Sequence, residues 1–358
     1  MTTRYAASSD EYARVLADWG ERRYRSEQVW HALYRARRPL DQATNLPTAL
    51  RERLASEFPL ALEEVATRSD DETTKWLFST RDGPQVETVL MRYRSRATVC
   101  VSTQAGCAMG CTFCATGQAG FERHLTAGEI VEQVARAAHV SLQRVGNVVF
   151  MGMGEPLANY EPVVEALRRL HHDFGCSARQ LTVSTVGVVP GMRRLAHEGL
   201  PVTLAVSLHA PDDELRSRLV PLNHRYPISE VLDAATEYAG ATGRRVSFEY
   251  ACISGLNDRP DQADALGQLL RGYHGVGGAH VNLIPLNPTG GFDGRASGRR
   301  SLRAFVQRLE THGIGATIRR NRGVDIDAAC GQLRTRAGAP PVGTRAGQNG
   351  ASPSEENR

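Results

Sequence analysis

The sequence has almost no lysine. Lys75 is the only one, although lysine and arginine together number 43 among the 358 residues. Basic charge is therefore carried by arginine, whose planar guanidinium makes bidentate contacts to phosphate and stays charged. This bias fits a phosphate-binding protein, and it equally fits a genome whose base composition favours arginine codons. The net charge of +4 is only mildly basic and does not decide between the two.

The sequence also lacks the roughly 18 consecutive apolar residues that a membrane span requires. The first ten residues are polar and predict no secretory signal peptide. Seven cysteines are too few, and too unevenly placed, for a disulfide scaffold in a chain of this length. Their odd number predicts metal binding or thiol chemistry in a reducing compartment. We therefore expect a cytoplasmic protein without membrane contact.

Residues 1–65 are expected to form a helical accessory domain. Ser26 is predicted to cap its second helix, and a third helix is predicted from Asn45-Leu46-Pro47 to Phe58. Arginines surround the predicted turns, at Arg22, Arg23, Arg25, Arg35, Arg37 and Arg38. This arrangement is typical of a compact nucleic-acid-binding module. A solvated basic surface on a small helical bundle would have the same composition.

Residues 66–95 are expected to form a β-rich linker, and residues 96–334 an α/β barrel. In the second region, strand patterns near 97–101, 145–151, 180–184, 201–207, 245–251, 279–286 and 316–319 alternate with helical patterns. Repeated strand–helix units predict a parallel sheet with helices outside. Their number favours a partial barrel of about six units over a closed barrel of eight. Residues 335–358 have no apolar periodicity and are expected to be disordered.

Three closely spaced cysteines, Cys107, Cys111 and Cys114, follow the first predicted barrel strand. Three thiolates within eight residues can converge on one inorganic centre. A [4Fe–4S] cluster with three cysteine ligands leaves one iron open. A tetrahedral zinc ion would need a fourth ligand, for which His124 is the nearest candidate.

The spacing Cys-x-x-x-Cys-x-x-Cys in such a loop resembles the signature of the radical S-adenosylmethionine (SAM) superfamily. Met151-Gly152-Met153-Gly154-Glu155-Pro156 resembles the superfamily's Gly-Gly-Glu-Pro motif, in which Gly154 and Glu155 would contact the amine of SAM. Other polar residues end predicted strands at the face where barrel enzymes bind ligands: Ser184, Ser207-Leu208-His209 and Asn287. Such residues can also be plain helix caps; the resemblance favours SAM contacts.

Further motifs resemble one subfamily, the RlmN/Cfr family of RNA adenosine methyltransferases, over about residues 10 to 335. They are the run from Cys100 to Cys107, Gly120-Phe121, Thr182 to Gly187, Ser207 to Pro211, Asn282 to Pro288, and Ala328 to Leu333. His124 and Asn321 depart from the family's pattern. The resemblance implies a partial radical SAM barrel with a helix-hairpin-helix-like accessory domain, one [4Fe–4S] cluster per chain, and two SAM molecules per turnover.

The resemblance also implies a mechanism. One SAM methylates Cys330, and a second is cleaved to a radical that removes hydrogen from this methyl group. The carbon radical adds to adenine, and Cys100 releases the product by forming a disulfide with Cys330. Glu87 matches the family's proton acceptor. The implied partners are 23S rRNA, tRNA, an external one-electron donor and a disulfide reductant. The enzyme itself is expected to be a monomer.

Within the family, Arg322 to Leu333 and the N-terminal module favour the branch that methylates C2 of adenosine 2503 in 23S rRNA and adenosine 37 in some tRNAs. The alternative is C8 methylation of the same rRNA adenosine, which confers antibiotic resistance. An alternative of another class is a non-catalytic RNA-binding metalloprotein.

Overall fold

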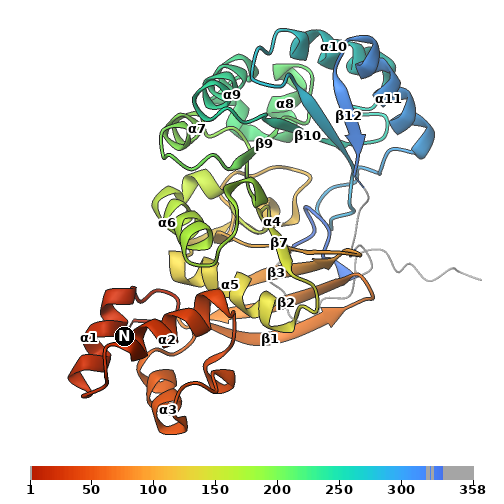
Figure 1. The fold of residues 1–358 in the computed structure, drawn as a ribbon. Coiled ribbons are helices and arrows are strands. Elements are labelled where there is room, and N and C mark those ends of the chain that lie inside the picture. The colour runs from red at the N-terminus through yellow and green to blue at the C-terminus, as the bar shows by residue number, and fades with distance from the viewer. Residues whose placement is uncertain (1, 320–322, 324–325, 334–358) are drawn as a thin grey trace, which may run out of the picture.

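The computed structural model describes residues 2–319, 323 and 326–333. The predicted disorder of residues 335–358 and the departure at Asn321 fall outside these residues. Within them, the chain forms a helical N-terminal part, an antiparallel sheet extension and an open parallel barrel (Figure 1).

The N-terminal part is helical to Glu57. Its elements are α1 (Ser9–Asp18), α2 (Tyr24–Trp30), a π-helical turn (His31–Arg35), a 3₁₀ turn (Leu40–Gln42) and α3 (Thr48–Glu57). The predicted cap at Ser26 is wrong: α2 begins at Tyr24 with Arg23 as its N-cap residue, and the Ser26 hydroxyl donates a hydrogen bond to the Arg23 carbonyl. Aromatic side chains hold the helices together, as in the stacked pair Trp30 and Tyr34, 4.2 Å apart.

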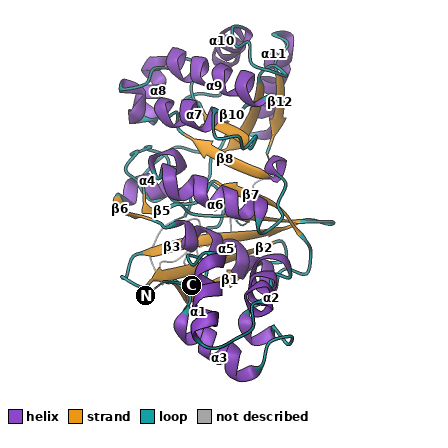
Figure 2. Cartoon of the chain, turned by 60° about the vertical axis from the view of Figure 1, so that its left-hand side comes forward, coloured by secondary structure: helices purple, strands orange, loops and turns teal. Residues whose placement is uncertain are grey.

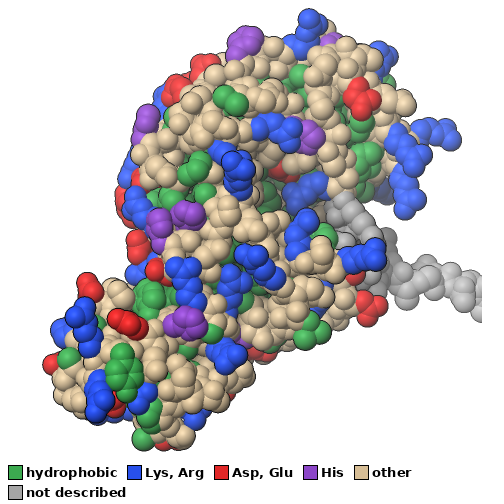
Figure 3. Space-filling model, in the orientation of Figure 1, with side chains coloured by type: hydrophobic (Ala, Val, Ile, Leu, Met, Phe, Trp, Pro, Cys, Tyr) green, Lys and Arg blue, Asp and Glu red, His purple; other side chains and the backbone are tan. Residues whose placement is uncertain are grey.

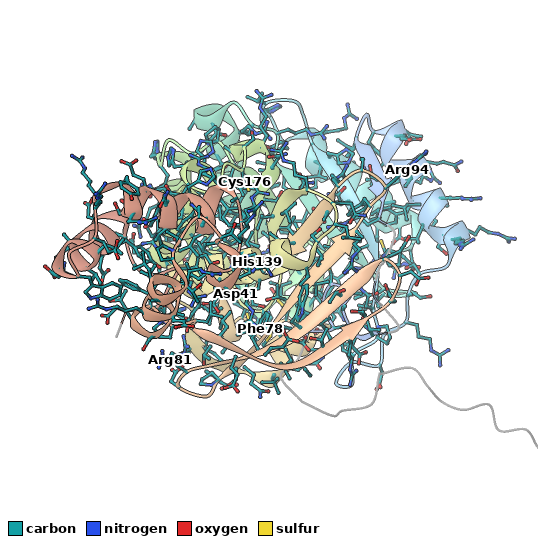
Figure 4. The ribbon with its side chains drawn as sticks, turned by 60° about the horizontal axis from the view of Figure 1, so that its bottom comes forward. Asp41, Phe78, Arg81, Arg94, His139 and Cys176 are labelled. Atoms are coloured by element: carbon teal, nitrogen blue, oxygen red, sulfur yellow. The ribbon has the colours of Figure 1, made fainter. Side chains whose placement is uncertain are left out.

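Two arginines attach this part to the barrel. Arg35 Nη2 donates to the His172 carbonyl at 2.6 Å, and Arg37 Nη2 donates to the Phe174 carbonyl at 2.9 Å. The Arg37 guanidinium also lies over the Phe174 ring. Burial lowers the pKa of His139 on α5 to about 4, and the guanidinium of Arg136 adds to this shift, whereas Asp41 of the N-terminal part opposes it; Figure 4 labels both His139 and Asp41. Part of the arginine excess is therefore structural.

The antiparallel extension consists of β1 (Leu62–Ser69), β2 (Thr73–Thr80) and β3 (Gln85–Arg92). Consecutive strands pair, and β3 continues onto β4 (Ala97–Cys100). β1 begins at Leu62, within the segment expected to be helical. Its start is held by the buried Glu132 carboxylate, which accepts hydrogen bonds from the amides of Ala61 and Leu62.

The barrel is a run of parallel strands in the order β4, β7 (Val145–Phe150), β8 (Leu181–Thr185), β9 (Thr203–Ser207), β10 (Ser247–Cys252), β11 (His280–Pro285) and β12 (Gly315–Ile318). Six main helices follow these strands: α5 (Ala127–Val140), α6 (Tyr160–His172), α7 (Val189–Ala196), α9 (Ile228–Thr242), α10 (Pro260–Arg271) and α11 (Arg299–Thr311). Figure 2 shows them along the outer side of the sheet. Within the described residues β1 and β12 end the ten-stranded sheet, so the predicted partial α/β barrel is confirmed.

Short elements complete the connections. They are the hairpin β5 (Gln104–Gly106) and β6 (Phe121–His124), the helices α4 (Ala115–Ala119) and α8 (Asp213–Leu219), and 3₁₀ turns at Pro156–Ala158, Ala178–Gln180 and Pro221–His224. Each is only three to seven residues long, which is too short for a clear periodic signal. In the described part of the chain, none of the helices has the length and apolar character to cross a membrane.

Candidate active site

The three clustered cysteines occupy the loop between β5 and α4. Cys107 N–H donates to the Gly120 carbonyl at 2.7 Å, so the loop closes back on itself where β5 pairs with β6. Gly106 permits this closure, because it has φ +73° and a Cβ would lie only 2.0 Å from the Gly120 oxygen. On the other side, Thr112 N–H donates to the Leu219 carbonyl at the end of α8.

The cysteine loop suits a bound cation cluster. Burial raises the pKa of the Cys107 thiol to about 12 and that of Cys111 well above its usual value, and neighbouring thiolates add to both shifts. Binding to iron would replace the thiol protons and remove this penalty. Among the described residues, no three His, Cys, Asp or Glu side chains converge closely enough to hold a single metal ion. Three thiolates of a [4Fe–4S] cluster bind three different irons, so the loop fits such a cluster.

A hollow at the carboxyl ends of the barrel strands adjoins this loop. Of the predicted SAM contacts, Gly154, Glu155, Ser184, Ser207, His209 and Asn287 line it, together with Cys111, Cys114, Phe113, Glu249, Arg319 and Cys330. Leu208 is fully buried and does not line the hollow, and neither does Cys107. Residues from successive strands and from the loops that follow them thus converge at one place, as the parallel topology requires.

Glu155 is the buried carboxylate of this hollow. Its two oxygens accept hydrogen bonds from the amides of Leu157 and Val186, at 3.0 and 2.9 Å. Burial nevertheless raises the pKa of Glu155 to about 7, with the amide hydrogen bonds opposing the shift. A cationic amine in the hollow would stabilise the charged form, so Glu155 fits a ligand that carries an ammonium group.

His209 is held in an unusual backbone conformation, with φ of 63°. Its Nδ1 accepts a hydrogen bond from the Ala251 amide at 2.9 Å, and its ring meets the Phe113 ring edge-on at 4.9 Å. Burial lowers the pKa of His209 to about 3, with the Arg216 guanidinium as the second cause. The imidazole is therefore neutral, with Nδ1 as the acceptor and Nε2 carrying the proton.

Sequence reasoning missed Arg216, which is fully buried on α8. Its guanidinium donates to the carbonyls of Val186, Ser207 and Leu208, and so joins the ends of β8 and β9. Burial lowers the pKa of Arg216 to about 10, and the nearby Cys111 opposes the shift. Nothing in the helical pattern of residues 213–219 distinguishes such an arginine from a solvated one.

A second hollow lies beside the first, and Cys330 lines both. Ile284 and Arg319 also line both hollows, whereas Cys100 lines only the second, as do Val89, Met91, Tyr93, Ile318, Ala328 and Ala329. Burial raises the pKa of the Cys100 thiol to about 12, with Cys330 as the next cause. The two outlying cysteines, 230 positions apart in the sequence by their numbers, are thus neighbours in the fold.

The Cys330 segment is fastened to both halves of the sheet. On the barrel side, Asn287 Nδ2 donates to the Cys330 carbonyl at 2.8 Å, and Ala115 N–H donates to the Gly331 carbonyl at 2.8 Å. On the extension side, Lys75 Nζ donates to the Asp327 carbonyl at 3.1 Å. Figure 1 shows the described residues beyond β12 returning to the orange strands.

Glu87, the remaining predicted site residue, lies on β3 and is 4% exposed. One carboxylate oxygen is 2.9 Å from Lys75 Nζ, and its backbone carbonyl accepts a hydrogen bond from the Ser102 hydroxyl. Glu87 lines neither hollow, but it is on the same strand face as Val89, which lines the second hollow. His124, the departure from the family pattern, contacts Gln104 through Nδ1 at 3.0 Å.

The site and fold define a radical SAM methyltransferase. The Radical SAM superfamily model matches residues 101–265. A crystal structure of a radical SAM methyltransferase from Sphaerobacter thermophilus is similar over 94% of this chain and 100% of its own, with 49% identity and a TM-score of 0.88.

Two curated relatives narrow the class. The proteins from Parafrankia sp. and Mycolicibacterium smegmatis are 52% and 49% identical, over 95% and 93% of this chain and 93% and 95% of their own lengths. Both are named as probable dual-specificity RNA methyltransferase RlmN. The chain belongs to the RlmN/Cfr family of radical SAM methyltransferases, on its RlmN branch.

Proposed function

We propose that this chain methylates C2 of adenosine 2503 in 23S rRNA and adenosine 37 in tRNAs. The observation that supports this function best is that Cys330 lines the hollow beside the cysteine loop as well as the hollow that contains Cys100. A methyl group carried on Cys330 would face the cofactor side, and the resolving thiol would lie on the other side. The relatives named as dual-specificity RNA methyltransferases support the choice of two RNA substrates.

In this proposal, Cys107, Cys111 and Cys114 hold one [4Fe–4S] cluster, and Gly154, Glu155, Ser184, Ser207, Leu208, His209 and Asn287 surround SAM. The bound cluster and SAM together supply hydrogen-atom abstraction. Glu155 would pair with the ammonium group of SAM. Neutral His209 would offer its Nε2 proton to an acceptor atom of the ligand. Leu208 can take part only by holding the strand end, because its side chain is fully buried.

The two remaining thiols carry and release the methyl carbon. Cys330 sulfur first accepts a methyl group from SAM and loses its own proton. After this carbon has bonded to the adenine, the radical adduct would give up one electron to the bound cluster and would lose the ring proton. Cys100 sulfur, having lost its own proton, then bonds to Cys330 sulfur while the Cys330 carbon–sulfur bond breaks, and the released carbon keeps that electron pair and takes up a proton. Glu87 is the proposed acceptor of the proton displaced from the adenine ring. An external thiol reductant then reopens the disulfide, and an external donor supplies electrons.

The N-terminal helical part, residues 1–65, is proposed as the RNA-binding accessory domain, joined by residues 66–95 to the barrel of residues 96–334. Arg22, Arg23 and Arg38 are exposed there. The only lysine is buried, so the basic side chains visible on the surface in Figure 3 are arginines, some of them around a hollowed face of the molecule. These suit a phosphate backbone. We further propose that the monomer acts in the cytoplasm, where cysteines stay reduced.

Nucleoside mass spectrometry tests this function. Reconstituted protein, SAM, a reductant and 23S rRNA or tRNA should yield 2-methyladenosine. Cys330→Ala should yield no methylated adenosine, and Cys100→Ala should accumulate a covalent protein–RNA species. The buried Cys176, which lines neither hollow, offers a matched control whose alanine variant should behave as wild type.

Other outcomes of the same experiment contradict the proposal in distinct ways. Formation of 8-methyladenosine would place the chain with the C8-methylating enzymes. Methylation by Cys330→Ala would refute the role of this thiol. RNA binding by a colourless zinc protein that forms no deoxyadenosine would identify the non-catalytic RNA-binding metalloprotein.

A further inference from the structure

A buried group of charged side chains joins the antiparallel extension to the Cys330 segment. Lys75 Nζ lies 2.9 Å from a Glu87 carboxylate oxygen, and these side chains are 8% and 5% exposed. The same ammonium donates to the Asp327 carbonyl, three residues before Cys330. Arg68 from β1 approaches the Asp327 carboxylate at 4.0 Å. The single lysine of the sequence is therefore buried between Glu87 and the segment that carries Cys330.

Stability alone does not explain the buried ion pair between Lys75 and Glu87. Removing two charges from water is costly, and a well-packed apolar pair of the same volume is often as stable or more so. Lysine and glutamate are rarely buried unless they are paired. In some proteins a buried ion pair selects one arrangement of its partners, and the partners here are Glu87 and, through the Asp327 carbonyl, the Cys330 segment.

The strand register puts Lys75 in line with the second hollow. Lys75 on β2 is opposite Val89 on β3, and Val89 is opposite Cys100 on β4. Residues opposite one another in an antiparallel pair project from the same face. Lys75 is therefore two strand spacings from Cys100, roughly 10 Å across the sheet. Glu87 shares the face of Val89, two residues along β3.

We propose that Lys75 is a positioning residue that holds the Glu87 carboxylate and the Cys330 segment in register with each other. Lys75 contacts both, the first through its ion pair and the second through the Asp327 carbonyl. It pairs with Glu87 in the charged form, the form that can accept a proton. This role rests on the proposed function, because Glu87 and Cys330 act together only in that reaction.

Substitution of Lys75 should separate the first half of the reaction from the second. In Lys75→Met, the first turnover of 5′-deoxyadenosine formation should continue, whereas methylated adenosine should form at least roughly tenfold more slowly, at similar KM for RNA. Lys75→Arg should recover most of this loss because it keeps a cation and a donor. Equal slowing of both products, or no slowing of either, would overturn the proposal.

A double-mutant cycle distinguishes action through Glu87 from an independent effect. Lys75→Met/Glu87→Gln should be slowed by much less than the product of the two single losses, because the two residues act as one unit. The double variant removes both members of the ion pair, whereas Lys75→Met leaves the Glu87 carboxylate buried without its lysine partner. The double variant therefore remains informative if Lys75→Met folds poorly. Fully multiplicative losses would contradict the proposal.

A measurement without turnover tests the contact with the Cys330 segment. Hydrogen–deuterium exchange in the peptide covering residues 326–333 should be faster in Lys75→Met than in wild type, with exchange across β10 and β11 unchanged. Arg193→Gln, which removes an exposed ion pair with Glu237, is the matched charge control. Unchanged exchange at 326–333 would refute the role of Lys75 even if RNA methylation is confirmed, whereas absence of methylation by wild type would refute the proposed function itself.

Discussion

In the parallel half of the sheet, from β4 to β12, the candidate functional side chains lie near the carboxyl ends of strands. In the antiparallel extension they lie in the middle of strands, on one face of the sheet. Glu155 follows β7, Ser184 and Ser207 are the penultimate residue of β8 and the last residue of β9, and all three line one hollow. Lys75 and Glu87 instead lie within β2 and β3 and are paired across the ladder. The parallel half thus gathers groups around a cofactor-sized hollow, while the extension supplies a surface on which the Cys330 segment rests.

The largest effect that this comparison predicts comes from a cysteine of the parallel half. Cys111→Ala should abolish iron binding and deoxyadenosine formation, because it removes one of three thiolates that the cluster requires. Glu87→Gln, in the extension, should bind iron as wild type does and still fail to complete methylation. Iron content, visible absorption and deoxyadenosine yield after anaerobic reconstitution measure the difference.

Cys176→Ala is the matched control for loss of a buried thiol. Cys176 is 2% exposed, and burial raises its pKa, as for Cys111, but it lines neither hollow. This variant should keep its iron. If Cys111→Ala also kept a full cluster, or if Glu87→Gln lost it, the assignment of cluster binding to the parallel half alone would be wrong.

Sequence reasoning could predict the parallel half because its signals are contiguous. The three cysteines lie within eight residues, and Gly154-Glu155 follows a recognisable strand, so each motif can be interpreted without knowing what faces it. Barrel topology then brings successive strand ends to one edge. The alternation of strands and helices was sufficient to predict the partial barrel itself.

The extension was less predictable because its contacts are non-local. Lys75 and Asp327 are separated by 252 positions, and no periodicity connects them. β1 was expected to be partly helical, since a strand whose residues are mostly exposed carries little apolar alternation. Arg216 is buried by the same kind of distant contact, with the carbonyls of β8 and β9.

The next effect concerns the backbone of the first hollow. Gly154 has φ +98°, and a Cβ there would lie 2.6 Å from the Cβ of Gln104. Gly154→Ala should therefore displace the turn that carries Glu155, lower stability by about 1–3 kcal/mol, and weaken SAM binding by roughly a hundredfold. Equilibrium dialysis of SAM with the reconstituted protein and thermal unfolding measure the two effects.

Gly240→Ala provides the control for a glycine substitution. Gly240 is an exposed residue inside α9 with nothing near its missing Cβ, so alanine should stabilise the helix by about 0.5–1 kcal/mol and leave SAM binding unchanged. If Gly154→Ala bound SAM as well as Gly240→Ala does, the hollow would not depend on this close approach.

The smallest effect compares two buried carboxyl groups, one lining the first hollow and one on α5 beside the start of β1. Burial raises the pKa of Glu155, in the hollow, and of Glu132, which holds the start of β1, to about 7 in both cases. A carboxyl whose folded pKa exceeds its usual value of about 4.5 stabilises the fold below that value, and this stability is lost as the pH rises through about 7. Lowering the pH from 8 to 6 should therefore raise the thermal stability of wild type, and either glutamine variant should reduce this slope.

SAM affinity should separate the two groups, because only charged Glu155 can attract the ammonium group of SAM. With a pKa of about 7, its charged fraction falls from roughly nine-tenths at pH 8 to one-tenth at pH 6, so affinity should fall by up to about tenfold. Glu155→Gln should remove this part of the pH dependence and also controls for titration of SAM itself. Glu132→Gln should retain the wild-type pH dependence of SAM affinity. Identical SAM profiles for wild type and Glu155→Gln would show that the carboxylate does not contact the ligand, and the first hollow would then owe its affinity to the cluster and the strand ends alone.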